Sequence, residues 1–243
     1  MIKQIDINCD LGEGVGNEAA IMPFISSCNI ACGGHAGDAQ SVMEVVALAK
    51  ANGLKVGAHP SFPDKVNFGR KPMMLSADDL GTSLRKQILL VLEVCARENI
   101  KMNHVKPHGA LYNLCAVDES LAGVVVDVLL STCPKVVLFA PYGSAITKIA
   151  HGKVKMYYEA FADRNYNTDL TLVSRSQKDA MITEEKDIFN HVLMMVAGKI
   201  RVKSGEEIET KVDTICIHGD NPKAVSIARY LYSNLMARNI KIK

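Results

Sequence analysis

Short apolar segments alternate with longer amphipathic segments along the whole chain. The short segments are rich in Ile and Val, as strands buried on both faces of a parallel sheet should be. They cover residues 3–9, 24–32, 55–59, 100–106, 135–140, 154–161 and 213–219. A strand followed by a helix, repeated about seven times, predicts an α/β fold whose parallel sheet is covered by helices, either closed into a barrel or open.

Helix start signals support this assignment of the longer segments. Ser76 opens a segment with the pattern of a capping box, and apolar residues then recur about every four positions. Asp38 is placed to cap a second helix, and Asn221 with Pro222 opens the last one. No linker rich in Pro, Gly or Ser and no internal repeat divides the chain, so we expect a single domain over residues 1–243.

Polar clusters follow the predicted strands. Their sequences are NCDLGEG, ACGGHAGD, GAHP, VKPHGALY, EAFADRNY and IHGDNP, and only FAPYGS, after the fifth strand, is chemically bland. In a parallel α/β fold, the segments after the strands share the carboxyl edge of the sheet, where sites assemble. Residues more than a hundred positions apart are therefore expected to converge on one active-site rim.

Carboxylates and imidazoles in the first three clusters are the first candidates. Asp10, at a strand end, could act as a general base or hold a cation, and Glu13 follows it in a glycine-rich turn. His59 precedes a proline that favours extended backbone, so its side chain projects from the strand tip. Asp10, His35 and His59 form a set that could bind zinc or another divalent ion. Asp38 is equally well explained as a helix cap and as a site residue.

The fourth cluster carries a lysine between two histidines. Strand alternation places His104 and Lys106 on one face, and Pro107 ends the strand before His108. Lys106 would supply either fixed positive charge or a base of lowered pKa, and His108 could transfer a proton near neutral pH. For His104 we favour a hydrogen-bonded core position.

The last two clusters and the SRSQ segment complete the candidate set with Asp163, Arg164, Arg175, His218 and Asp220. Arginine offers a planar fork suited to carboxylate or phosphate, although an adjacent Asp and Arg can also form a routine surface ion pair. The chain has neither a P-loop motif nor a G-x-S-x-G nucleophile elbow. The available groups suit acid–base hydrolysis with water as the nucleophile, aided by fixed charge.

The composition of the chain indicates which binding partners and which cellular compartment to expect. The net charge is +2, and the basic residues are scattered without interleaved aromatics, so nucleic acid is not an expected partner. The seven cysteines are odd in number and include no C-x-x-C, which predicts reduced, buried thiols. No apolar run approaches the roughly 20 residues of a membrane span, and the first residues lack a signal-peptide core. We therefore expect no membrane partner and a cytoplasmic location.

Eight motifs in order along the chain resemble the LamB/YcsF lactam-utilisation family, whose members are described as the A subunit of ATP-dependent 5-oxoprolinase. The motifs are DINCDLGEG, NIACGGHAGD, GAHPSFPD, FGRKPM, HVKPHGALYN, EAFADRNY, LVSR and CIHGDNPKAV. One departure is Leu170 and Thr171, where the family tends to have a glycine before its arginine, here Arg175.

The resemblance implies an irregular seven-stranded barrel, similar to that of polysaccharide deacetylases. It also implies hydrolysis of 5-oxo-L-proline to L-glutamate with ATP as co-substrate, together with two further subunits, B and C. Under this hypothesis Asp10 positions or deprotonates water, Lys106 stabilises negative charge and His108 protonates the departing nitrogen. Arg164 or Arg175 would hold the substrate carboxylate or phosphate. Because the phosphate loop is missing, we assign ATP activation to the partners.

The hypothesis sorts the candidates into two groups. Asp10, His59, Lys106 and His108 are the catalytic candidates. The substrate- or phosphate-binding candidates are Glu13, His35, Asp38, Asp163, Arg164, Arg175, His218 and Asp220. Two other functions stay open: a metal-dependent amide or carbohydrate deacetylase, and a non-catalytic ligand-binding subunit.

Overall fold

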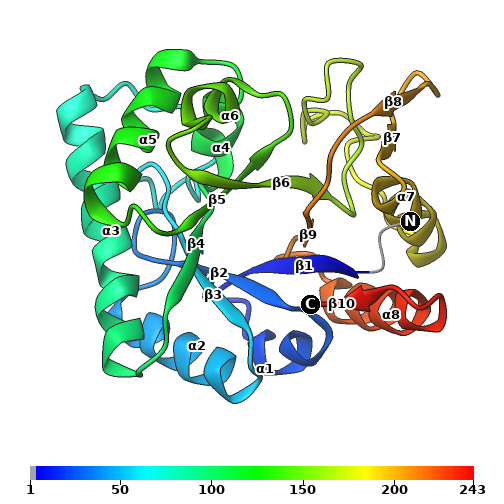
Figure 1. The fold of residues 1–243 in the computed structure, drawn as a ribbon, viewed down its shortest axis with the longest axis horizontal. Coiled ribbons are helices and arrows are strands. Elements are labelled where there is room, and N and C mark those ends of the chain that lie inside the picture. Colours follow the sequence, from blue (N-terminus) through cyan, green and yellow to red (C-terminus); the bar gives the residue numbers. More distant parts are fainter. Residues whose placement is uncertain (1–3) are drawn as a thin grey trace.

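The computed structural model describes residues 4–243, in which seven parallel strands close into a barrel (Figure 1). Around the ring these are β1 (Gln4–Leu11), β2 (Ser27–Ala31), β3 (Lys55–His59), β4 (Met102–Val105), β5 (Val137–Pro141), β6 (Lys155–Phe161) and β9 (Thr214–Ile217). Pairing of β1 with both β2 and β9 closes the ring. The prediction of a seven-stranded parallel barrel is confirmed, and the open sheet is excluded.

Helices surround the barrel and connect its strands (Figure 1). The helices are α1 (Glu18–Ile21), α2 (Ala39–Ala51), α3 (Ala77–Arg97), α4 (Gly109–Cys115), α5 (Glu119–Thr132), α6 (Ala145–Ala150), α7 (Glu185–Val196) and α8 (Ala224–Ala237), with a 3₁₀ turn η1 (Met22–Phe24). Helices α2, α3 and α5 lie along one side of the barrel, and α7 with α8 lie on the opposite side. The apolar core lies between these helices and the outward faces of the strands.

The interior of the barrel is polar. Alternation in β1 buries Ile5, Ile7 and Cys9 in the apolar core, while Asn8 and Asp10 join buried polar groups from other strands. Hydrogen bonds link these groups across the barrel: the Asn8 side-chain amide donates to Glu159 and Thr214, and the Asn29 amide donates to Asn8 and Asp10. The closed barrel thus carries a connected polar network beneath its carboxyl end.

The predicted helix caps are largely confirmed. Asp38 accepts a hydrogen bond from the Ser41 amide at the start of α2, and Ser76 accepts one from Asp79 at the start of α3. The last helix begins later than predicted, at Ala224, because a turn comes first: the Ala224 amide donates to the Asn221 carbonyl.

Three short strands have no counterpart in the predicted pattern. Strand β7 (Lys199–Arg201) and strand β8 (Glu207–Glu209) form an antiparallel hairpin after α7, and β10 (Lys241–Ile242) pairs with β1. All seven cysteines are buried free thiols, as predicted. Within residues 4–243, no helix is both long and apolar enough to cross a membrane.

Candidate active site

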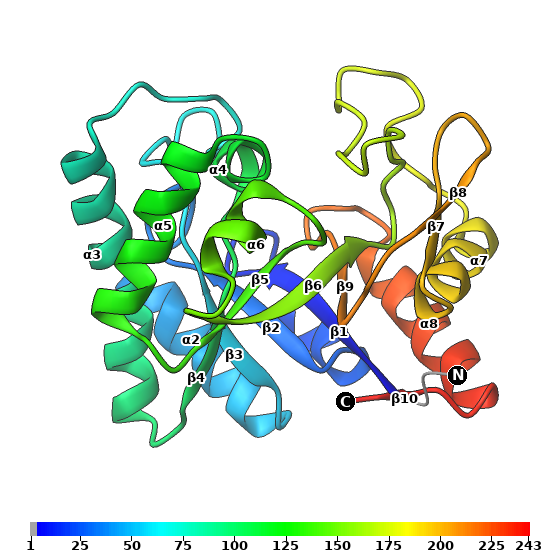
Figure 2. The ribbon, with the colours of Figure 1, turned by 45° about the horizontal axis from the view of Figure 1, so that its top comes forward.

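A cavity of about 750 Å³ opens at the carboxyl ends of the barrel strands. Figure 2 shows the long segment between β6 and α7, coloured yellow-green, on the same side of the barrel as the loop between β3 and α3. Nine of the twelve predicted site residues line the cavity: Asp10, Glu13, His59, Lys106, His108, Arg164, Arg175, His218 and Asp220. The predicted convergence of the polar clusters on one rim is therefore present in the structure.

Lys106 lies on the cavity floor among three strands, with only 2% of the residue exposed. Its Nζ is 2.9 Å from Asp10 Oδ1, 3.2 Å from Glu159 Oε1 and 3.0 Å from Cys216 Sγ. Burial opposes the charged form, but the interactions with Asp10, Cys216 and Glu159 together outweigh it and raise the pKa of Lys106 well above its usual range. Of the two possible roles, this favours fixed positive charge.

Asp10 is the anionic partner of Lys106. Its Oδ1 also accepts a hydrogen bond from the Asn29 amide at 2.7 Å, and its Oδ2 lies 3.5 Å from His59 Nε2. Burial favours the neutral acid, yet the interactions with His59 and Lys106 hold the pKa of Asp10 well below its usual range. Asp10 is thus held as a carboxylate. The backbone of Gly219 packs against that of Asp10, because a Cβ at Gly219 would be only 2.1 Å from the Asp10 carbonyl oxygen.

Glu159 and Tyr112 line the cavity floor and were missed by the sequence analysis. Glu159 Oε1 accepts a hydrogen bond from Asn8 at 2.9 Å, whereas neither Glu159 Oε2 nor the Tyr112 hydroxyl has a hydrogen-bond partner among residues 4–243. Burial raises the pKa of Glu159, so the two carboxylates beside Lys106 are shifted in opposite directions. A sequence signal did exist, because Glu159 is an acid inside an otherwise largely apolar strand.

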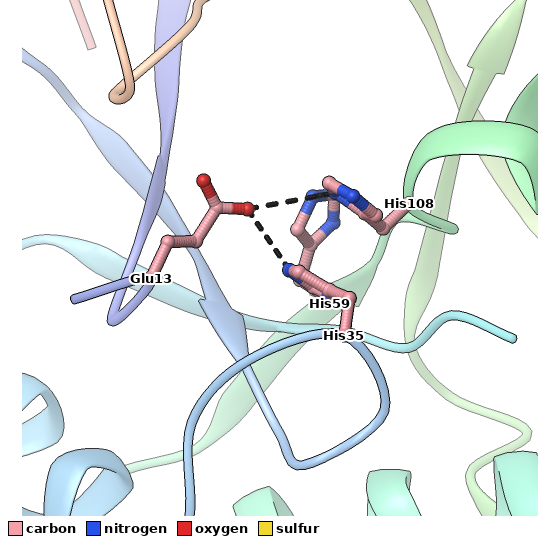
Figure 3. Close-up of side chains that lie close together, drawn as sticks. All are labelled: Glu13, His35, His59 and His108. Carbon is pink, nitrogen blue, oxygen red and sulfur yellow. Dashed lines mark hydrogen bonds and ion pairs between the residues drawn. The ribbon is translucent and has the colours of Figure 1, made fainter. Parts of the chain in front are cut away.

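A second cluster, formed by Glu13, His35, His59 and His108, lies beside Asp10 (Figure 3). The His35 and His108 rings stack at 3.6 Å, and one donor atom from each of the four residues lies within 4.8 Å of all the others. Burial lowers the pKa of His35 and lowers that of His108 still further. These four residues could hold a metal ion. His35 and His59 belong to the predicted metal set, while Asp10 lies next to this cluster and is bound to Lys106.

Asp163 lies behind the cavity wall and orients His218. Its buried Oδ1 is 2.7 Å from His218 Nδ1, so the carboxylate accepts a hydrogen bond from the Nδ1–H group. In the neutral ring this leaves His218 Nε2 as an acceptor. Burial raises the pKa of Asp163, but the interaction with His218 outweighs this and the pKa is lowered overall. The two predicted candidates thus form one unit, with His218 on the cavity surface.

The arginines of the cavity have different roles. Arg164 is buried and donates to the carbonyls of Val173 and Ala180, which holds together the segment between β6 and α7. Arg175 is exposed at the rim. Arg70, which the sequence analysis did not single out, also lines the cavity and forms an ion pair with Asp220.

The remaining predictions concern residues away from the cavity surface. His35 lies behind Glu13, and Asp38 caps α2 without lining the cavity. The core position of His104 is confirmed, because its Nε2 is 2.7 Å from Asn29 Oδ1 and its ring stacks on a phenylalanine. Leu170, at the departure from the family pattern, does line the cavity and has a φ of 62°, a conformation that glycine adopts more easily.

Comparison with known proteins adds independent information. The model of the LamB/YcsF family matches residues 5–243. The A subunit of 5-oxoprolinase from Pyrococcus furiosus is 41% identical over 98% of this chain and 96% of its own length. The crystal structure of a lactam utilization protein from Thermus thermophilus superposes with a TM-score of 0.93 at 34% identity, covering 99% of both chains. The T48 deacetylase with substrate shares the fold, with a TM-score of 0.50 at 11% identity over 100% of this chain and 88% of its own.

Proposed function

The chain belongs to the LamB/YcsF family, and from that premise we propose that it is the hydrolytic subunit of an ATP-dependent 5-oxoprolinase. The reaction would open the lactam amide of 5-oxo-L-proline to give L-glutamate while ATP is hydrolysed to ADP and phosphate. The names of the relatives support this substrate class. The observation that carries the proposal is the buried Lys106 ammonium between Asp10 and Glu159 on the cavity floor.

The lactam needs activation before water can attack it. Its five-membered ring is nearly unstrained, and its amide is resonance-stabilised like a peptide bond. Phosphorylation of the lactam oxygen would remove this resonance and make the ring carbon electrophilic. Because the chain has no phosphate loop motif, we assign that phosphorylation to two partner subunits, B and C.

Asp10 and Lys106 would carry out the attack on the activated ring. The Asp10 carboxylate orients water and accepts its proton, and the Lys106 ammonium stabilises the negative charge that develops. The carbon–nitrogen bond then breaks, and the nitrogen takes up a proton. The resulting acyl phosphate reacts with a second water to give the carboxylate and free phosphate. The side-chain groups of Asp10, Lys106 and Glu159 are close enough to act on one substrate, because Lys106 Nζ lies 2.9 Å from Asp10 and 3.2 Å from Glu159.

Glu159 is a better proton donor to the departing nitrogen than His108. Burial lowers the pKa of His108, which favours the neutral imidazole, but raises the pKa of Glu159, which favours the neutral acid. A pair of carboxylates whose pKa values are shifted apart is a common basis for acid and base roles. The exposed Arg175 and Arg70 on the rim supply positive charge for the substrate carboxylate or phosphate.

The direct test is an assay of glutamate formation from 5-oxoproline and ATP, with this chain alone, with its partners, and with the partners alone. We expect glutamate only when all the subunits are present, and no ATP turnover by this chain alone. Tight ATP binding and turnover by this chain alone would contradict the assignment of activation to the partners.

The cluster of Glu13, His35, His59 and His108 favours one alternative, a metal-dependent amide or carbohydrate deacetylase. Release of acetate from acetylated amides or sugars by the chain alone, lost on chelation, would support it over the lactam reaction. A non-catalytic ligand-binding subunit is the other possibility. In that case Asp10→Asn would change ligand affinity or assembly and leave turnover largely intact.

A further inference from the structure

Two backbone carbonyls determine which nitrogen of His59 and of His108 carries a proton. His59 Nδ1 lies 2.8 Å from the Lys106 carbonyl oxygen, and His108 Nε2 lies 2.9 Å from the Phe68 carbonyl oxygen. A carbonyl oxygen only accepts hydrogen bonds, so both of these ring nitrogens are N–H donors. In their neutral forms the two rings therefore have unprotonated lone pairs at His59 Nε2 and His108 Nδ1.

These two lone pairs face each other. His59 Nε2 and His108 Nδ1 are 3.0 Å apart, the distance of a hydrogen bond, although neither neutral ring has a proton to place between them. Lone pairs this close repel each other unless a cation lies at the same place. The cation is either an additional proton on one of the rings or a metal ion that both nitrogens bind.

Two more donors face the same place. Glu13 Oε1 is 3.5 Å from His108 Nδ1 and 2.9 Å from His35 Nε2 (Figure 3). We propose that Glu13, His35, His59 and His108 bind one divalent transition-metal ion. Bonds of about 2.0–2.1 Å in a tetrahedral site would place the donors about 3.4 Å apart. Since the donors lie within 4.8 Å of one another, the widest pair has to close by up to about 1.4 Å.

The surroundings favour a metal ion over a single proton. The side chains of the four residues are at most 7% exposed, and the nearby Asp10 adds a second carboxylate to that of Glu13. Lys106 supplies one positive charge to this region, bound directly to Asp10. Two carboxylates with one ammonium leave one excess negative charge, which attracts a cation. A proton is shared by two atoms, whereas four donors converge here, as the binding of a metal ion requires.

The donor set indicates the class of metal. Three imidazoles and one carboxylate suit zinc, iron, nickel or cobalt, whereas magnesium and calcium prefer oxygen donors throughout. Hydrogen bonds from the outer N–H of His59 and His108 to carbonyls are the usual support of metal-ligating histidines. His35 differs, because its Nδ1 has no hydrogen-bond partner in the described part of the chain, and its proton can move there when Nε2 binds the ion.

The experiment measures metal binding by the full chain alone, after removal of metal with a chelator. Zn²⁺ is titrated by calorimetry, and Co²⁺ is followed by its visible absorption. The variants are Glu13→Gln and His108→Asn, and the control is His151→Asn, at an exposed position after α6. We expect one ion per chain and a Co²⁺ band for the wild type and the control. Both cluster variants should bind more than about 100-fold more weakly, because even outer-shell changes cost 10–100-fold.

Two results would overturn the metal site. One is a wild type that binds neither Zn²⁺ nor Co²⁺, and the other is unchanged affinity in both cluster variants. Glu13→Gln keeps the size and shape of the side chain, so it remains informative if His108→Asn fails to fold, and circular dichroism reports folding in each case. The titrations contain neither lactam nor ATP, so their outcome is separate from that of the proposed 5-oxoprolinase activity.

Discussion

Lys106 contributes to the stability of the barrel and is also central to the proposed reaction. Asp10 from β1, Glu159 from β6 and Cys216 from β9 all contact its ammonium, which is buried on the cavity floor. A buried charge that loses its partner is far more costly than a surface charge, because no water replaces the lost interaction. Changes at this position should therefore affect folding as well as turnover.

Replacing Lys106 by methionine should destabilise the protein by about 3–5 kcal/mol near neutral pH, because it leaves the buried Asp10 carboxylate without its counter-ion. Urea denaturation of wild type and variant measures the difference. Adding Asp10→Asn to the variant should recover part of the loss, since one uncompensated charge is removed. A Lys106→Met variant as stable as the wild type would show that the ammonium does not neutralise the Asp10 carboxylate.

Glu159→Gln should slow glutamate formation by the complete complex about 10²- to 10⁴-fold, the usual contribution of a general acid. Glutamine retains an oxygen that can accept the Asn8 hydrogen bond, so the variant should fold. Glu207→Gln, in the exposed β7–β8 hairpin, is the matched control and should leave the rate unchanged. A fully active Glu159→Gln variant would rule out proton donation by this side chain.

At the scale of elements, the strands and the polar segments after them follow from local pattern. Strand residues such as Ile5 and Ile7 are apolar because helices cover them, and that periodicity is visible in the sequence. Closure of the ring is not visible, because β1 and β9 pair residues such as Asp6 and Thr214 that lie far apart in the chain. Glu159 was missed because the predicted candidates came from the polar segments after the strands, although an acid inside a largely apolar strand was a usable signal. Arg70 was missed because its loop has no periodicity.

Asp38 is the N-cap of α2, so we expect it to affect the stability of that helix. Asp38→Ala should lower the free energy of unfolding by about 1 kcal/mol, since the Ser41 amide loses its acceptor. Glutamate formation by the complex should be unchanged. Thermal denaturation and the coupled assay check both expectations, and loss of activity at unchanged stability would instead assign Asp38 to substrate binding.

His191 on α7 should make folding stability depend on pH. Burial lowers the pKa of His191 from 6.5 to about 4. Between these values the unfolded chain takes up a proton that the folded chain does not, so stability falls as the pH falls from 6.5 to 4. The contribution reaches about 3 kcal/mol. In His191→Gln this contribution to the pH dependence of the free energy of unfolding should disappear. Urea denaturation of variant and wild type between pH 7 and 4 measures it, and the same pH dependence in both would show that His191 does not cause it.

At the scale of the whole molecule, the polar interior of the barrel leads into the cavity at the carboxyl ends of the strands. Residues in or directly after β1, β4, β6 and β9 reach the same cavity because parallel strands end on the same side. The loops after β3 and β6 supply the arginines of the rim, where a phosphorylated lactam would enter. Under the proposed function, the cavity floor would carry out hydrolysis and the rim would receive the activated substrate.

The central claim is that this floor opens the activated lactam ring. The most direct measurement is the rate of glutamate release from 5-oxoproline and ATP by the complete complex containing Asp10→Asn, with folding and assembly verified. The account predicts a loss of about 10²-fold or more, because the water loses its base. A folded, assembled Asp10→Asn complex that releases glutamate at the wild-type rate would contradict the claim.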